Sequence, residues 1–545
     1  MKYFTLARNQ FLVGLLVFSI VFSACSSSKL SSNTNSYSGK SETVQNQPMS
    51  SRASNMANSS MNTSSVAADY SPYGNESEAK GERYAAITEN PFLESSRAPL
   101  STFSIDVDTA SYSNVRRFLN EGSLPPKDAV RIEELVNYFE YDYPQPVGDV
   151  PFSVNTDVAT APWNAKHKIV QIGLQGKKVS LDNVPPSNIV FLLDVSGSMT
   201  SQLPMLKDSL RILVNQLSVK DRVAIVVYAG ASGLVLPSTN NKSEIMNALE
   251  DLQAGGSTNG GAGIQLAYKV ALDNFIQGGN NRVILATDGD FNVGLASDNE
   301  LVKMIENKRK SGVFLSVLGF GAGNLNDSMM EKLADKGNGN YSYIDSKDEA
   351  KKALGQQVAG TLYTIAKDVK IQVEFNPALV AGYRLIGYEN RLLADKDFND
   401  DKKDAGEIGA GHTVTALYEI VPAGTAIINP GVDELKYSKV ERSETQFGNE
   451  MMTVKLRYKE PDANESRLLS VGVLDVNKSI ESASENLRFA SAVAQFGLIL
   501  RDSRYKGSAS FRNINNLAGG ALGDDLRNYR SEFLGLVEKA QRLQN

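Results

Sequence analysis

Short apolar runs alternate with amphipathic segments between Asn188 and about Ile365, and this alternation constrains the fold more than any other feature of the sequence. The apolar runs are NIVFLLDVS, DRVAIVVYAG, NRVILATDG and VFLSVLGFGAG, and segments such as PMLKDSLRILVNQL and GIQLAYKVALDNFI separate them. Strands that are apolar along their whole length are typical of parallel sheets, which helices cover on both faces. The pattern therefore predicts a doubly wound, mainly parallel α/β domain over residues 187–365.

Strand-like segments flank this domain on both sides. FSVNTDVATA and HKIVQIGLQG precede it, and DVKIQVEFNP, HTVTALYEIVP and MMTVKLRYKE follow it. Two strands alone are marginal in water, and a domain whose ends lie close together tolerates insertion into a host. We therefore expect residues 151–186 and 366–478 to form one β-sandwich-like domain with the α/β domain inserted in it. The alternative is that the early strands pack on the helices that precede them.

Helical spacing of apolar residues also marks the two ends of the folded part. Residues 91–150 read as a small, mainly helical N-terminal module whose helices are separated by Pro125-Pro126, and residues 479–545 as a C-terminal helical region. Residues 25–90 are rich in serine and asparagine and show no periodicity, so they cannot bury enough apolar surface to fold. We interpret them as a disordered tether.

The first 24 residues have the features of a secretory signal peptide: basic residues, an apolar stretch from Phe11 to Phe22, and small residues before Cys25. The sequence FSAC resembles a bacterial lipobox, which implies that Cys25 becomes the lipid anchor of a cell-envelope membrane protein. The alternative is an ordinary signal peptide with an incidental cysteine. Ser26 stands where an aspartate would mark inner-membrane retention in enterobacteria, so the outer membrane is favoured.

Composition excludes several classes of function. The net charge of −6 leaves no basic footprint for nucleic acid. The chain of 545 residues has two histidines and one cysteine, which rules out Cys/His zinc sites and a disulfide framework. A metal ion would have to be bound by oxygen atoms.

Oxygen-bearing side chains follow three of the predicted elements. The first strand ends in DVSGSM, the loop before a later helix reads GGSTNGGAG, and the strand NRVILATDGD ends in an aspartate. In an open α/β sheet, binding sites lie beyond the carboxyl ends of the strands, so these side chains are expected to converge. Few carboxylates and several hydroxyls suit Mg²⁺ or Mn²⁺. The predicted ligands are Asp194, Ser196, Ser198, Thr258 and Asp288.

In their order and positions, these three segments resemble a von Willebrand factor A domain with a complete metal-ion-dependent adhesion site. The resemblance implies that Ser196 and Ser198 bind the ion directly and that Asp194 and Asp288 hold it partly through water. It also implies that Thr258 switches between direct and water-mediated coordination. One position would be left for an acidic residue of a protein partner. The flanking regions, over roughly residues 90–545, resemble bacterial von Willebrand factor A lipoproteins of the YfbK type.

Two other motifs lead to weaker interpretations. SIDVDTAS, with Asp106 and Asp108, and LGDDLRN, with Asp524 and Asp525, imitate the first and last motifs of haloacid-dehalogenase phosphatases. Neither is presented by an apolar parallel strand, so both are interpreted as turns or caps. GFGAGN imitates a dinucleotide loop but lacks the third glycine and a surrounding βαβ unit.

Three functions are compatible with an oxygen-ligated ion. The first is a non-enzymatic adhesion or assembly-scaffold role that binds a protein partner, with no small-molecule substrate. The second is a metal-assisted hydrolase, for which Asp290 and Asn292 are the only obvious additional groups. The third is a scaffold with a purely structural ion. His167, His412 and Trp163 are interpreted as ordinary structural residues.

Replacing the predicted lipidation site tests the anchor directly. Cys25→Ala removes the thiol that would carry the acyl chains, so we expect the variant to leave the membrane fraction after carbonate washing, while the parent stays. Two or more acyl chains are needed for stable anchoring, which makes the difference large. Equal partitioning of variant and parent would place the anchor elsewhere.

Overall fold

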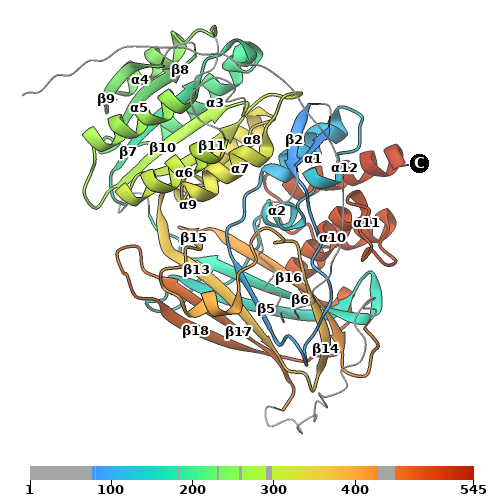
Figure 1. The fold of residues 1–545 in the computed structure, drawn as a ribbon. Helices are drawn as coiled ribbons and strands as arrows, with labels where there is room; N and C mark the ends of the chain where they lie inside the picture. The colour runs from blue at the N-terminus through green and yellow to red at the C-terminus, as the bar shows by residue number, and fades with distance from the viewer. Residues whose placement is uncertain are drawn as a thin grey trace, which may run out of the picture. The chain divides into compact units, whose positions relative to one another are not determined.

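The computed structural model describes residues 76–79, 81–180, 184–229, 232–256, 260–289, 298–427 and 448–544 (Figure 1). The predicted signal peptide, Cys25 and most of the predicted tether lie outside these residues, as do Thr258, Asp290 and Asn292. In the part of the chain that is described, no helix is long and apolar enough to cross a membrane.

Six described strands form the central sheet of the α/β domain, in the order β12-β11-β10-β7-β8-β9. They are β7 (Ser187–Asp194), β8 (Arg222–Tyr228), β9 (Ser232–Thr239), β10 (Asn280–Thr287), β11 (Phe314–Gly319) and β12 (Tyr341–Tyr343). All neighbouring pairs are parallel except β8 and β9, which are antiparallel. The mainly parallel sheet predicted from the apolar runs is confirmed.

Helices cover both faces of this sheet (Figure 1). The first face packs against α3 (Leu203–Gln216), α4 (Lys242–Glu250), α8 (Lys347–Lys351), a π-turn (Lys352–Gln356) and α9 (Val358–Leu362). The other face packs against α5 (Gly260–Asp273), α6 (Asp298–Lys308) and α7 (Asp327–Lys336). β7 supplies Phe191 to the first core and Val190 to the second, so the domain is doubly wound as predicted.

Two antiparallel sheets form the host domain. One has the order β3-β14-β16-β6-β5, with β3 (Leu93–Glu94), β5 (Phe152–Ala161), β6 (Asn164–Gly176), β14 (Val380–Ile386) and β16 (Thr413–Pro422). The other contains β4 (Leu100–Ser104), β13 (Thr364–Phe375), β15 (Gly406–Gly409), β17 (Glu450–Lys459) and β18 (Arg467–Leu474). Their inner faces enclose one apolar core, in which Ile172 of β6 and Val373 of β13 are buried.

The insertion is visible in the strand pairing. β6 precedes the α/β domain, and β16 follows it, yet the two strands pair antiparallel from Lys168↔Ile420 to Gln175↔Thr413. The predicted pairing between the early and late strands is therefore confirmed. The alternative, in which the early strands pack only on helices, is wrong.

The predicted helical module over residues 91–150 is wrong as a separate unit. β3 pairs with β14 and β4 pairs with β13, so its first part belongs to the sandwich. Its helices α1 (Ala110–Asn120) and α2 (Ile132–Asn137) share a core with α10 (Glu485–Leu500), α11 (Phe511–Gly519) and α12 (Tyr529–Gln544). Helices this short cannot bury their apolar faces against each other alone, and the C-terminal helices complete the layer.

Order also begins before residue 91, where the tether was expected to continue. β1 (Glu76–Ala79) and β2 (Glu82–Ala85) form an antiparallel hairpin. Tyr84 is fully buried with Phe118 and Ala129, and Glu82 forms an ion pair with Arg117 at 2.8 Å. The Arg83 N–H also donates to the Leu325 carbonyl at 2.9 Å, and the Gly323 N–H donates to Glu82 at 2.7 Å. These contacts with distant segments dock the strand, and none of them produces a periodic pattern in the sequence.

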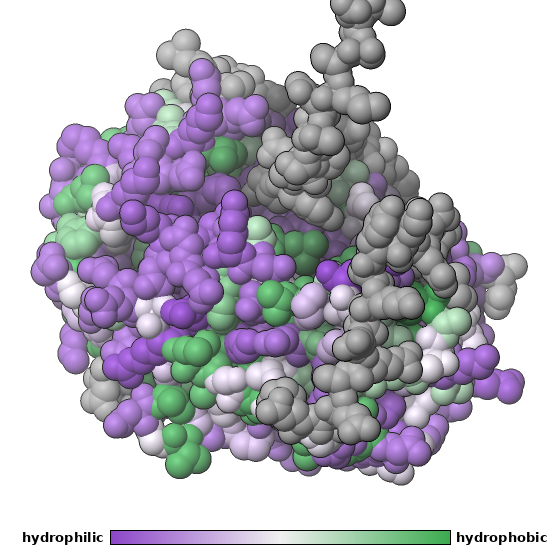
Figure 2. All heavy atoms as spheres, turned by 60° about the horizontal axis from the view of Figure 1, so that its bottom comes forward, coloured by the Kyte–Doolittle hydropathy of each residue, from purple (hydrophilic) through white to green (hydrophobic). Residues whose placement is uncertain are grey.

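The face of the molecule in Figure 2, which brings the bottom of the Figure 1 view forward, is mostly hydrophilic. Apolar side chains form small separate groups among the polar ones. Exposed leucines of the edge strand β18, Leu468 and Leu474, are 56% and 53% exposed. Scattered exposure of this kind is normal for a folded surface.

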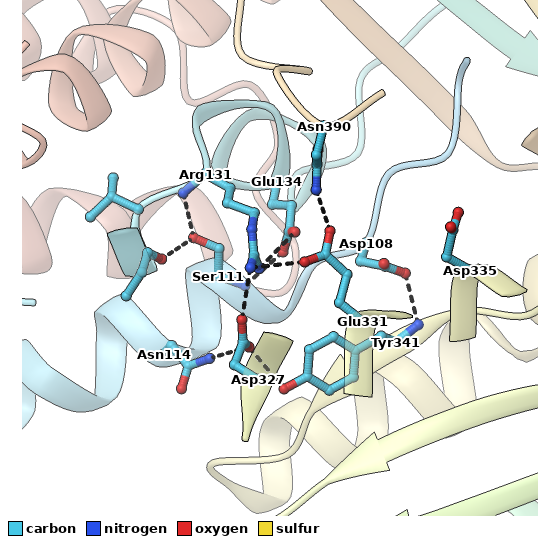
Figure 3. A network of polar contacts seen from close by, with 12 residues as sticks. Asp108, Ser111, Asn114, Arg131, Glu134, Asp327, Glu331, Asp335, Tyr341 and Asn390 are labelled. Carbon is cyan, nitrogen blue, oxygen red and sulfur yellow. Dashed lines mark hydrogen bonds and ion pairs between the residues drawn. The ribbon is translucent and has the colours of Figure 1, made fainter. Parts of the chain in front are cut away.

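A buried ionic network joins the α/β domain to the segments around it (Figure 3). The guanidinium of Arg131, just before α2, lies 2.9 Å from Asp327 and 2.8 Å from Glu331, both on α7. Arg391, from the loop after β14, lies 3.1 Å from the other oxygen of Glu331. Arg131 is 3% exposed, and removing one partner of such a buried pair leaves the other charge uncompensated. The network therefore fixes how the inserted domain sits on its host.

Carboxyl groups outnumber the arginines at this junction. Asp108 accepts a hydrogen bond from the Tyr341 backbone N–H at 2.7 Å and lies 3.5 Å from Arg391. Burial raises the pKa of Asp108 to about 7, although Arg391 opposes the change. Burial and the charge of Asp335 raise the pKa of Asp106 to about 6. Asp106 and Asp108 therefore stay protonated to a higher pH in the folded protein than in the unfolded chain, and their protonated forms stabilise the junction.

The free energy of unfolding is expected to fall as the pH rises from about 4 to about 7. Carboxyls whose pKa is raised in the folded state stabilise it fully below their unfolded pKa, and this stabilisation is lost as the pH rises through the folded values of about 6 and 7. Each whole unit of raised pKa corresponds to about 1.4 kcal/mol. Chemical denaturation at several pH values measures the slope.

Asp108→Asn keeps an acceptor for the Tyr341 N–H but cannot ionise, so the slope should become smaller. Asp348→Asn is the matched control, because Asp348 is 80% exposed on the surface of α8. An unchanged slope in Asp108→Asn would contradict the assignment of this carboxyl.

Candidate metal-ion site

The predicted metal-binding loop follows β7 and is hydrogen-bonded to the loop that precedes α5. The Gly255 N–H donates to the Val195 carbonyl at 2.7 Å, and the Gly197 N–H donates to the Gly256 carbonyl at 3.2 Å. The first and second predicted segments therefore lie side by side. Thr258, the predicted ligand on the second segment, lies outside the described residues.

Asp194 is buried at the end of β7 and is held by three hydrogen bonds. One carboxylate oxygen accepts the Ser196 backbone N–H at 3.0 Å. The other accepts the hydroxyls of Tyr228, at 3.2 Å, and Thr287, at 3.0 Å. The sequence analysis missed both hydroxyl donors. Their only signal in the sequence is position, since Tyr228 ends β8 and Thr287 ends β10, the two strands beside β7.

The two serines present their hydroxyl oxygens together. Ser196 Oγ and Ser198 Oγ are 3.0 Å apart, Ser196 is buried, and Ser198 is exposed at the start of the helical turn Gly197–Ser201. Adjacent ligands of an octahedral Mg²⁺, with metal–oxygen distances of about 2.1 Å, are separated by about 3.0 Å. The spacing of the hydroxyls fits two neighbouring positions around such an ion.

Asp288 follows β10 directly and is held by the loop after β11. Its Oδ2 accepts a hydrogen bond from the Asn324 side-chain amide at 2.9 Å. Gly321 of the same loop has φ +86°, and a Cβ there would lie 3.5 Å from the Asp288 Cβ. The GFGAGN segment, which imitates a dinucleotide loop in sequence, thus positions a carboxylate.

The electrostatics of the site favour a cation. Burial raises the pKa of Asp194, and the nearby charge of Asp288 raises it further. Among the described residues, no lysine or arginine forms an ion pair with Asp194. A divalent cation between the two carboxylates would lower the pKa of Asp194 and so oppose the effects of burial and of the Asp288 charge.

The donor set consists of carboxylates and hydroxyls. The described residues contain no group of three His, Cys, Asp or Glu side chains placed to hold a metal ion. A set of carboxylate and hydroxyl oxygens fits a hard cation better than zinc.

Comparisons with known proteins identify the family of this chain. Residues 188–357 match the family model of the von Willebrand factor type A domain, and residues 360–543 match that of "Uncharacterized protein YfbK, C-terminal". Residues 78–171 match a model described as von Willebrand factor. The Escherichia coli protein YfbK is 45% identical over 472 residues, which cover 84% of this chain and 81% of the relative. The chain belongs to the YfbK family.

More distant similarities are confined to parts of this YfbK-family protein. Human inter-alpha-trypsin inhibitor heavy chain H3 is 25% identical over 261 residues, which cover 44% of this chain and 29% of the relative. The crystal structure of the conserved hypothetical protein BatB from Bacteroides thetaiotaomicron is 25% identical with a TM-score of 0.28. The match covers 32% of this chain and 97% of the BatB chain.

All five predicted ligands of this YfbK-family protein fall within the matched von Willebrand factor type A domain. Such domains commonly bind Mg²⁺ or Mn²⁺ at a metal-ion-dependent adhesion site and generally mediate protein–protein interactions. The structure brings Asp194, Ser196 and Ser198 together in one loop and places the charge of Asp288 close to Asp194. The assignment of all five as ligands stays a prediction.

Ser198→Ala should weaken Mg²⁺ binding by more than about tenfold, because it removes one predicted direct ligand. Ser198 is exposed, so the thermal unfolding temperature should change little. Ser201→Ala is the matched control, since it removes an exposed hydroxyl three residues further along the same turn. Isothermal titration calorimetry compares the three proteins, and equal affinity in all of them would exclude Ser198 as a ligand.

Proposed function

We propose that this protein is a lipid-anchored cell-envelope protein that binds a protein partner through a metal-bridged carboxylate. Asp194, Ser196, Ser198, Thr258 and Asp288 would hold Mg²⁺ or Mn²⁺, and the ion would offer its open position to an acidic side chain of the partner. The observation that supports this most is the pair of serine oxygens 3.0 Å apart, one buried and one exposed, beside the buried Asp194.

The surroundings of the site favour binding over hydrolysis. The hydrogen bonds that Asp194 accepts come from the Ser196 backbone N–H and from the hydroxyls of Tyr228 and Thr287, none of which is a general base near neutral pH. His167 instead contacts Glu419 in the sandwich. Von Willebrand factor type A domains are generally non-enzymatic interaction domains.

A purely structural ion is also less well supported. β7 is buried along its length between β8 and β10, and apolar clusters cover both faces of the sheet. The domain therefore has a complete core without an ion. Ser198 is exposed, which supports the proposal that a second molecule could reach an ion bound to this ligand.

Anchoring would place this site at a membrane surface. Cys25 would carry the lipid, and the serine- and asparagine-rich residues that follow would separate the folded part from the bilayer. The outer membrane is the proposed location, on the basis of Ser26.

Crosslinking in intact envelopes tests the proposal. With Mg²⁺ present, the parent protein and Ser201→Ala should crosslink to the same partner, and EDTA should reduce this capture at least about tenfold. Ser198→Ala and Thr258→Ala should behave like the EDTA sample while keeping the parent's unfolding temperature. Capture that is unaffected by EDTA and by both variants would contradict a metal-bridged partner.

A further inference from the structure

A cavity of about 550 Å³ lies in the host domain and shares no lining residue with the α/β domain. Four segments far apart in the sequence contribute to its wall: residues 91–92, 163–167, 419–421 and 504–507. Its volume falls within the range of roughly 300–1,000 Å³ that is typical of small-molecule sites. Neither the family matches nor the predicted metal site accounts for it.

Aromatic side chains form much of the wall. The ring of Phe92 meets the rings of His167 and Tyr505 edge to face, each with centroids 5.5 Å apart. Trp163 also lines the cavity and is 1% exposed. Phe92, His167 and Tyr505 contact one another, so they form one continuous aromatic wall on which a flat ring can pack.

The fourth segment is built closely onto the β5–β6 hairpin. The Ser508 N–H donates to the Trp163 carbonyl at 3.0 Å. Gly507 has φ +48°, and a Cβ at this position would lie 2.4 Å from the same carbonyl oxygen. Only glycine permits this approach, so the wall that carries Tyr505 has a fixed position.

The buried charges behind the wall are already compensated. Glu419 accepts from His167 Nδ1 at 2.6 Å and from the Arg384 guanidinium at 3.0 Å. Burial opposes the ionisation of Glu419, but these two bonds and the nearby Trp163 indole outweigh it and lower its pKa. The carboxylate is therefore not free to attract a cationic ligand. With Nδ1 engaged by Glu419, His167 keeps Nε2 for another contact.

Arg504 gives the rim an excess of positive charge. Its guanidinium lies over the Tyr505 ring at 4.7 Å, and the buried Arg384, behind the wall, lies over the same ring at 4.3 Å. Arg504 is exposed, and no ion pair joins it to a carboxylate in the described part of the chain. Because Arg384 already compensates Glu419, the charge of Arg504 remains, and it makes the rim of the cavity complementary to an anion.

We propose that this cavity is a binding site for a small molecule that combines a flat ring with a carboxylate. The ring packs on the continuous wall that Phe92 and Tyr505 form, and the carboxylate meets Arg504 at the rim. Binding here is independent of the metal-ion site and of a protein partner.

Trp163 provides a direct readout, because it is the only tryptophan of the chain and lines the cavity. The probe is para-nitrobenzoate, whose nitro-substituted ring quenches tryptophan emission. We expect saturable quenching by this carboxylate, with at least about tenfold weaker binding of the neutral para-nitrobenzyl alcohol. EDTA should have no effect on either titration.

Arg504→Gln should weaken the binding of para-nitrobenzoate about tenfold and leave the affinity for para-nitrobenzyl alcohol unchanged. Lys506→Gln removes the same charge two residues away, where Lys506 is paired with Asp502, and should bind as the parent does. Tyr505→Ala should lose saturable quenching by both compounds while circular dichroism reports an intact fold. Quenching that does not saturate, equal affinity for acid and alcohol, or equal effects of Arg504→Gln and Lys506→Gln would overturn the proposal.

Discussion

The antiparallel pairing of β6 with β16 is the constraint on which the rest of the structure depends. These strands lie on opposite sides of the α/β domain in the sequence, and their hydrogen bonds close the host around it. The pairing holds both ends of the inserted domain near one sheet, which fixes two covalent connections at once. It also creates two faces with different partners. Residues such as Ile172 and Ala416 face the sandwich core, while Ile169 and Leu417 face the helical layer.

Buried carboxylates serve two different roles in this chain. At the junction, Arg131 and Arg391 form ion pairs with Asp327 and Glu331, and burial raises the pKa of Asp106 and Asp108, which favours their protonated form. At the end of β7, Asp194 has hydroxyl and backbone donors but no arginine or lysine ion pair among the described residues. A carboxylate compensated by arginine stabilises an interface, whereas one left with neutral donors is suited to a cation.

The parts of the fold that could be predicted are those with a local signal. Apolar runs and helical spacing identified the α/β domain, and strand alternation on both sides identified the insertion. The spacing in short amphipathic helices shows that one face is buried, but it does not show which element covers that face. For this reason the sequence pattern alone predicts a separate module over residues 91–150. The same limit applies to β2, because the Tyr84 ring and the Glu82 carboxylate that dock it contact residues distant in the sequence.

The residues of the candidate metal-ion site show the same difference between local and long-range signals. Asp194, Ser196 and Ser198 are close in sequence, so a motif reveals them, and the structure gives the hydroxyl spacing that a motif cannot. Tyr228, Thr287 and Asn324 belong to three other elements, and only the strand order brings them to the carboxylates.

His167 and Trp163 look ordinary in sequence because the other walls of their cavity come from segments hundreds of residues away. β16 runs from Thr413, beside the end of the inserted domain, to Glu419 and Val421 at this cavity, and it pairs with β6 on one side and β14 on the other. A strand hydrogen-bonded on both sides cannot shift without breaking ladder bonds. The same constraint that positions the inserted domain therefore also gives the cavity its rigid floor.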